Sequence, residues 1–75
     1  MFEAYRDIMT PVEAFEALGI HRSKGYSLLA DGTIPSFHLG RRICVPKAHL
    51  IAFVEEQTRL DSIRRTSESE VSYYN

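Results

Sequence analysis

The sequence has little of what several function classes require. Cys44 is its single cysteine, which excludes a framework of internal disulfides. The chain has no apolar run long enough to cross a bilayer and no signal peptide, so we expect an intracellular protein without a membrane partner. A nucleophile elbow, a phosphate-binding loop and a paired-carboxylate signature are also lacking, so we do not expect an enzyme. A length of 75 residues allows one domain with a small core.

The formal net charge is −1, but the charges are distributed unevenly along the chain. When lysine and arginine are counted against aspartate and glutamate, residues 1–20 carry −3, residues 21–49 carry +4 and residues 50–75 carry −2. Ionic screening confines each charge interaction to about 8–10 Å. A basic middle third on an otherwise acidic protein is therefore still able to bind phosphate.

Residues 10–18 predict a short helix with a well-formed start. Thr10 can cap this helix, Pro11 occupies its first position, and Glu13 stands three residues after the cap. The side expected to face the core holds Ala14, Ala17 and Leu18, with Phe15 at its edge. Gly19 fits the left-handed residue that closes a helix, which predicts a turn into a second helix.

The second helix is predicted to begin at His21 or Arg22 and to run until Asp31-Gly32. The face expected to turn inward holds Gly25, Leu28 and Leu29. The outer face is small and polar, with two cations and an aromatic ring: Arg22, Ser23, Lys24, Tyr26 and Ser27. Such a face suits a helix in the DNA major groove, because it offers hydrogen-bond donors with little bulk. The alternative is an ordinary solvated helix.

Residues 36–45 alternate in the manner of a β-hairpin, and Gly40-Arg41-Arg42 interrupts the alternation. Two registers fit this pattern. A two-residue turn would place an arginine and a cysteine on the same face as Phe37 and Leu39, whereas a three-residue loop would group those two residues with Ile43 and Val45. We prefer the three-residue loop because it gives a wholly apolar face, although glycine usually comes last in such a loop.

A last helix is predicted to begin at Val45-Pro46-Lys47. The residues that would close the core with it are Leu50, Ile51, Phe53 and Val54. The periodic pattern fades after Gln57, so we place the domain at residues 10–60 and interpret residues 61–75 as a polar, disordered tail. Residues 1–9 fit either an extra helical turn or a loosely held N-terminal extension, and we favour the second.

Metal binding is not expected from this sequence. The nitrogen and sulfur ligands that it offers are His21, His38, His49 and Cys44. Their spacing matches no zinc motif, and a residue beside a hairpin core is more often a structural one. We therefore expect neither a metal nor a cofactor.

The order of the predicted elements favours DNA binding. Helix, turn, helix, hairpin and helix in succession predict a small α+β domain, the winged helix-turn-helix. Arg41 and Arg42 then belong to the tip of a two-stranded wing, where arginine side chains reach phosphates or a minor groove. The alternative is a solvated turn whose charge serves solubility. Two basic elements, placed for two contacts on one duplex, favour the wing.

The chain also resembles a known family over residues 9 to about 55. The segments that carry the resemblance are Thr10-Pro11-Val12-Glu13-Ala14, Leu18-Gly19-Ile20, Arg22-Ser23-Lys24-Gly25-Tyr26, Gly32-Thr33-Ile34-Pro35, Leu39-Gly40-Arg41-Arg42 and Val45-Pro46-Lys47, followed by Leu50 and Phe53. In this order they are similar to the small excisionases (recombination directionality factors) and AlpA-like proteins, related in fold to the MerR type. Three positions depart from the usual pattern: His21 replaces a Ser-type cap, Gly25 a β-branched core residue and Ser27 a frequent basic residue.

The resemblance implies architectural DNA binding without chemistry, in the cytoplasm and on the nucleoid of a bacterial host. Such proteins, encoded by phages or mobile elements, bind beside attachment sites in several copies, bend the DNA and steer a tyrosine or serine integrase toward excision. The same scaffold also serves transcriptional regulators of prophage genes. A protein-interaction module without DNA binding is an alternative of a different class.

Further contacts are expected outside the helix and the wing. The candidates for phosphate contact are His21 and Lys47, and those for contact with a neighbouring copy or an integrase are Glu13, Glu16, Leu60, Ile63, Tyr73 and Tyr74. The acidic first helix and the basic middle third have opposite signs, so copies on adjacent sites can meet head to tail in an open row. We expect a monomer in solution and cooperative loading on DNA.

Overall fold

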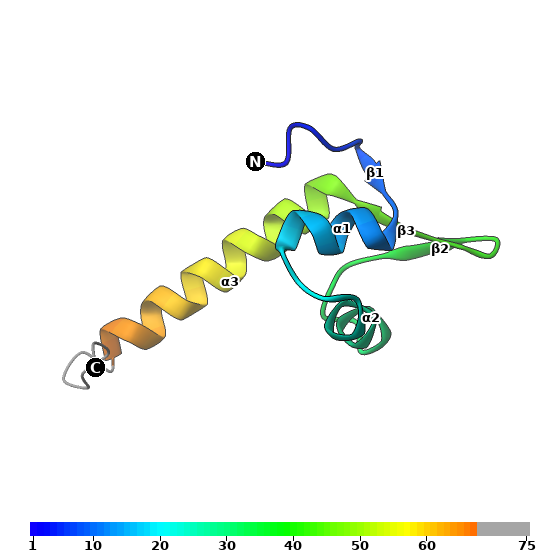
Figure 1. Ribbon diagram of the computed structural model, residues 1–75. Helices are drawn as coiled ribbons and strands as arrows, with labels where there is room; N and C mark the ends of the chain where they lie inside the picture. The colour runs from blue at the N-terminus through cyan, green and yellow to red at the C-terminus, as the bar shows by residue number, and fades with distance from the viewer. Residues whose placement is uncertain (68–75) are drawn as a thin grey trace.

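Three helices and a three-stranded antiparallel sheet make up the computed structural model, which describes residues 1–67 (Figure 1). In chain order the elements are β1 (Ile8–Met9), α1 (Pro11–Leu18), α2 (Arg22–Ala30), β2 (Phe37–Leu39), β3 (Arg42–Pro46) and α3 (Lys47–Ser67). The strand order in the sheet is β1-β3-β2. The helix pair, the hairpin and the closing helix follow one another as the sequence predicts. The predicted α+β class and the winged helix-turn-helix are therefore confirmed.

Both short helices begin at a side-chain cap, and the cap of α1 is the predicted Thr10. The Thr10 hydroxyl accepts a hydrogen bond from the Glu13 N–H at 3.2 Å, and the Glu13 carboxylate accepts one from the Thr10 N–H at 2.9 Å, which completes a capping box. His21 caps α2, because its Nδ1 accepts from the backbone N–H of Ser23 at 3.3 Å. The imidazole thus does at residue 21 what a serine hydroxyl does at other helix starts.

The stability of the domain is expected to fall at acid pH through Glu13. The hydrogen bond from the Thr10 backbone, and then the Arg6 guanidinium at 3.0 Å, lower the pKa of this carboxyl from its ordinary value of 4.5. A lowered folded-state pKa means that the contribution of Glu13 is complete above about pH 4.5 and is lost as the pH falls through the lowered pKa. Thermal unfolding of Glu13→Gln should therefore depend less on acid pH than that of the wild type. Glu16→Gln, an exposed change on the same helix, should keep the wild-type profile, and the reverse ranking would contradict this role of Glu13.

The core forms where α1, the sheet and the start of α3 meet, and α2 packs on it through α1. Its buried cluster consists of Met9, Ala14, Phe15, Ile34, Val45 and Leu50. The sequence predicts Phe15 at the edge of α1, but this residue is only 2 % exposed and its ring lies against α2. Gly25 makes room for the ring, since an added Cβ would come within 2.6 Å of three ring atoms. The side-chain volume that Gly25 lacks is thus supplied by Phe15.

The hairpin has the two-residue turn, which the sequence analysis considered but did not prefer. Its opposed pairs are Phe37 with Cys44, His38 with Ile43, and Leu39 with Arg42. The turn therefore holds two residues, Gly40 and Arg41, and Gly40 has a φ of 64°. A positive φ at the first turn position only is the pattern of a type II′ turn, whose first residue is glycine and whose twist matches that of the strands. This match outweighs the apolar face that a three-residue loop would have made, and Leu39 stays exposed beside Arg42.

The N-terminal segment joins the sheet. Ile8 and Met9 form β1 and pair with Pro46 and Val45 of β3, and Met9 is buried in the core. Neither expectation for residues 1–9, a helical turn or a loose extension, describes this strand. Two residues are too few to show an alternating pattern in the sequence, so the strand is visible only through its partner.

Helix α3 is longer than the sequence predicts. It continues to Ser67 and extends away from the hairpin, beyond the body of the domain (Figure 1). The prediction of a disordered tail from residue 61 onward is therefore wrong for residues 61–67. Ion pairs one turn apart, Arg59 with Glu56 and Arg64 with Asp61, support this part of the helix in place of core contacts.

Candidate nucleic-acid interface

Helix α2 presents one face to solvent along its length. Gly25 is buried, and Leu28 and Leu29 are half-buried, so the opposite side of the helix faces outward. The residues predicted for DNA contact are all exposed there: Arg22, Ser23, Lys24, Tyr26 and Ser27. Their exposure agrees with the sequence analysis, while their contact with bases stays a prediction.

Tyr26 is held by the core although it belongs to the outer face. Its ring stands edge-on to that of Phe15, with the ring centroids 4.9 Å apart and the ring planes at 80°. Such a pair contributes about 0.5–1.5 kcal/mol beyond the area that it buries. Because 46 % of Tyr26 is still exposed, the contact orients an aromatic side chain on the surface of α2.

The hairpin of β2 and β3 projects from the body of the domain, with Arg41 and Arg42 exposed at its end (Figure 1). Side chains alternate between the two faces of a strand, so Arg42 and its partner Leu39 lie on the face opposite to His38 and Ile43. Leu39 is 61 % exposed, more than any other large apolar residue in residues 1–64. The tip thus combines arginine side chains with an uncovered apolar one.

The eight lysine and arginine side chains of residues 1–64 divide into two groups according to their partners. Four are paired with acidic side chains: Arg6 with Glu13, Lys47 with Asp7, Arg59 with Glu56, and Arg64 with Asp61. The other four form no ion pair with the part of the chain that the structure describes: Arg22, Lys24, Arg41 and Arg42. All of this second group lie on α2 or on the wing. A surface that concentrates such cations attracts the phosphates of a nucleic acid.

Comparison with protein families finds a match over residues 8–58 to the family described as helix-turn-helix domain. The match includes the strand β1, the helix pair, the wing and the first half of α3. The chain belongs to this family. It is a DNA-binding helix-turn-helix domain, and its partner is double-stranded DNA. Comparisons with curated proteins and with solved structures find no match.

A pocket of about 400 Å³ separates the two basic elements of this helix-turn-helix domain. Its lining comes from α2 on one side and from the hairpin with its approach on the other: Tyr26, Leu29, Ala30, Ser36, His38 and Ile43. The sequence analysis assigned no DNA contact to Ser36 or His38. The two-residue turn sets His38 opposite Ile43, so both side chains lie on the face of the hairpin that lines the pocket. Ser36, two residues before His38, lines the same pocket.

The two candidate phosphate contacts outside the main surface have partners within the domain. The Lys47 Nζ donates to the Tyr5 carbonyl at 2.9 Å and lies 3.6 Å from the Asp7 carboxylate. With 19 % of its side chain exposed, Lys47 ties the N-terminal segment to the start of α3, and its phosphate contact stays a prediction. His21 is exposed at the start of α2, where its ring serves as the cap.

The candidates for contact with another protein differ in their availability. Glu13 is engaged in the capping box and with an arginine, whereas Glu16 is exposed on α1. Tyr73 and Tyr74 lie outside the described residues. Glu16 is thus more available than Glu13 for the predicted contact with a neighbour, which stays a prediction.

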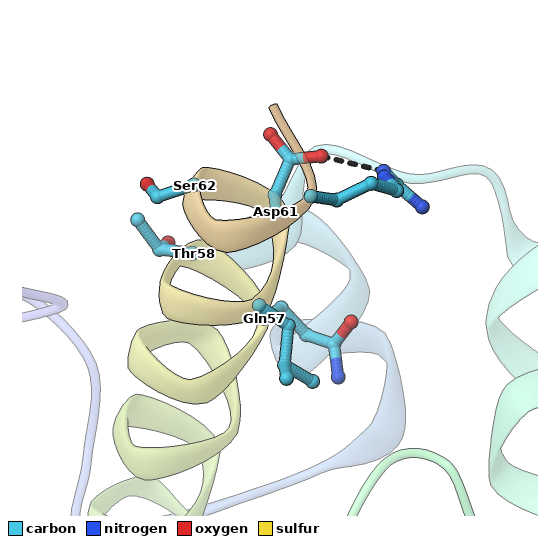
Figure 2. A pocket seen from close by; sticks show the side chains of 6 residues that line it. Gln57, Thr58, Asp61 and Ser62 are labelled. Atoms are coloured by element: carbon cyan, nitrogen blue, oxygen red, sulfur yellow. Dashed lines mark hydrogen bonds and ion pairs between the residues drawn. The ribbon is translucent and has the colours of Figure 1, made fainter. Parts of the chain in front are cut away.

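The projecting half of α3 carries a hollow of about 640 Å³ (Figure 2). Its lining consists of Gln57, Thr58, Leu60, Asp61, Ser62 and Arg64. Every one of these residues belongs to α3, and no other element of residues 1–67 lines the hollow. Leu60 and Ile63 are exposed on this part of the helix, which fits contact with another protein better than a small-molecule site.

The possible metal ligands lie on separate parts of the domain. His21 precedes α2, His38 belongs to β2, the buried Cys44 to β3 and His49 to α3. Within residues 1–67, no three histidine, cysteine, aspartate or glutamate residues are gathered to hold a metal ion. Over the same range, no helix has both the length and the apolar character that crossing a membrane requires.

Proposed function

We propose that this domain is a sequence-specific architectural DNA-binding protein, an excisionase that binds and bends attachment-site DNA and directs a phage or plasmid integrase toward excision. The observation that carries the proposal is the division of the basic side chains. Within residues 1–64, the basic side chains that form no ion pair all lie on α2 or the wing, and the others are paired elsewhere. The excisionase role is further supported by the ordered set of segments that resembles the excisionase family. The proposed place of action of the protein is the bacterial cytoplasm.

In the proposed complex, α2 lies in the major groove. Arg22 and Lys24 approach phosphates at the edges of the groove, while the two serines of the outer face reach base edges because their short side chains let the helix come close. Arg41 and Arg42 contact the neighbouring backbone or minor groove and carry little base code. Sequence preference therefore resides in α2 and affinity in both elements.

DNA bending is supported by the tip of the wing. Proteins that bend DNA from the minor groove often insert an apolar side chain between base steps, next to basic residues that hold the backbone. Leu39 has this setting, since it is 61 % exposed and stands beside the Gly40-Arg41 turn, opposite Arg42.

Cooperative binding is supported by the size of the surface. One nine-residue helix and one wing resemble the smallest DNA-binding modules, which bury about 600–1,000 Å² of protein surface. Four unpaired cations also limit the number of phosphate contacts. Neighbouring copies would add the missing affinity through Glu16 of one copy and the basic face of the next, and the projecting part of α3 offers Leu60 and Ile63 to a neighbour or to an integrase.

We expect the affinity per site to be higher on a duplex with two tandem sites than on a duplex with one, by about 5- to 150-fold for a typical coupling between sites. The site is first selected from a pool of random duplexes, and titrations then compare single sites, tandem sites and two sites moved apart by half a helical turn. The displaced pair serves as the control, because neighbours on opposite sides of the duplex cannot touch.

Equal affinity per site on all three duplexes would remove the cooperative model. The same surface would then serve a transcriptional regulator of prophage genes, which is the second candidate function. A domain that selects no duplex from the pool would contradict DNA binding through α2 and the wing altogether.

A further inference from the structure

The pocket between α2 and the wing has an apolar floor and a polar rim. Leu29 and Ile43 are half-buried at its base, whereas Tyr26, Ser36 and His38 are exposed around it. The rim thus offers a phenol, an alcohol and an imidazole, each of which can donate a hydrogen bond. Apolar surface and hydrogen-bond donors are next to one another in a concave site.

The two elements that line this pocket also carry the cations that form no ion pair within residues 1–64. Arg22 and Lys24 belong to α2, and Arg41 belongs to the end of the hairpin. Adjacent major and minor grooves of a duplex are separated by a single sugar-phosphate strand. A strand that passes from the cations of α2 to those of the wing would run along the space between the two elements, where the pocket lies.

We propose that the pocket seats this sugar-phosphate strand, with His38, Ser36 and Tyr26 donating hydrogen bonds to one of its phosphates. The inference rests on the proposed function, because it takes double-stranded DNA as the ligand. The chemistry of the strand fits the site: deoxyribose is an apolar ring that matches Leu29 and Ile43, and the phosphate beside it is an acceptor for the rim.

His38 has the central part in this contact because of the hairpin register. Its face of the wing turns toward α2, whereas Arg42 lies on the opposite face. A hydrogen bond from His38 to the intervening phosphate would fix how the helix and the wing sit together on the duplex. His38 is thus a positioning residue for sequence recognition and carries no base code itself.

Single methylphosphonate substitutions along a duplex selected from a random pool test the proposal. Each substitution removes the charge and one acceptor oxygen of one phosphate. A side chain is assigned to the phosphate whose substitution weakens the wild type but no longer weakens the alanine variant. The scan is made with the wild type and with the Lys24→Ala, His38→Ala and Arg41→Ala variants.

We expect His38→Ala to bind about tenfold more weakly than the wild type, the size of one hydrogen bond to a charged group. The phosphate assigned to His38 should lie between those assigned to Lys24 and Arg41. Tyr26→Phe keeps the ring against Phe15 and removes only the hydroxyl, so it should weaken binding by a smaller factor and show the same phosphate. His49→Ala is the matched control, because His49 is exposed on α3 and does not line the pocket.

The outcomes separate this inference from the proposed function. If Lys24 and Arg41 are each assigned a phosphate while His38 is assigned none, or one outside their interval, DNA binding stands and the pocket assignment is overturned. The pocket would then be left to a small apolar ligand. If the wild type selects no duplex, both the function and the pocket assignment fall. A loss with His49→Ala equal to that with His38→Ala also overturns the assignment.

Discussion

Substituting alanine for Gly25 should lower the thermal midpoint of the domain by about 10 °C. An added Cβ comes within 2.6 Å of three atoms of the Phe15 ring, and that ring is only 2 % exposed, so it cannot move aside without disturbing the core. Overpacking of this kind costs about 1–3 kcal/mol, against about 0.5–1 kcal/mol that alanine gains over glycine in a helix. Because the new Cβ meets three atoms of a buried ring, we take the upper end of the first range, about 3 kcal/mol less about 1 kcal/mol. The net loss of about 2 kcal/mol gives a shift of this size in a small domain. Thermal unfolding followed by circular dichroism measures it.

Two further variants show whether the ring contact is the cause. Ser27→Ala adds an alanine to the exposed face of the same helix and should change stability by less than about 0.5 kcal/mol. Phe15→Leu removes the ring atoms that the new Cβ meets. Combined with Gly25→Ala it should be less destabilising than the sum of the two single changes, by about 0.5–3 kcal/mol. Strict additivity would mean that another contact makes glycine necessary at this position.

Gly25 and Phe15 also show which parts of the packing can be predicted from the sequence. The inner face of α2, with Gly25, Leu28 and Leu29, follows from the helical period, and the structure agrees with it. The place of Phe15 does not follow from that period, because it depends on space left by a glycine on another helix. Local periodicity predicts which side of a helix is buried, but the depth of a large side chain is set by the neighbour that it meets.

The predicted register of the hairpin was wrong for a related reason. Grouping apolar residues on one face favoured a three-residue loop, but the backbone conformation available to Gly40 selected a two-residue turn. The expected register put His38 and Arg42 on the same face of the hairpin, whereas in the structure they lie on opposite faces, and His38 shares its face with Ile43. For this reason the contact now proposed for His38 was not visible in the sequence. The short strand β1 and the partners of Lys47 were missed because both depend on residues about forty positions apart.

Removing the four unpaired cations should abolish most of the affinity for DNA. Arg22→Ala with Lys24→Ala forms the helix pair, and Arg41→Ala with Arg42→Ala forms the wing pair. Each lost phosphate contact lowers the slope of log affinity against log salt by about 0.9, so the four together lower it by about 3.6. A slope of that size corresponds to about a hundredfold change in affinity between 50 and 200 mM salt. Titrations at several salt concentrations give both quantities.

The matched control is Arg6→Ala with Arg59→Ala, because it removes the same charge from side chains that already pair with Glu13 and Glu56. If net charge governed binding, the helix, wing and control pairs would all weaken it equally. If the surface governs it, the control pair keeps the wild-type salt slope. The wing pair then weakens binding to selected and unrelated duplexes by similar factors, and only the helix pair also changes the preferred sequence, because bases are read from α2. A control pair that weakens binding as much as the helix pair would show that the absence of acidic partners does not mark the DNA-binding surface.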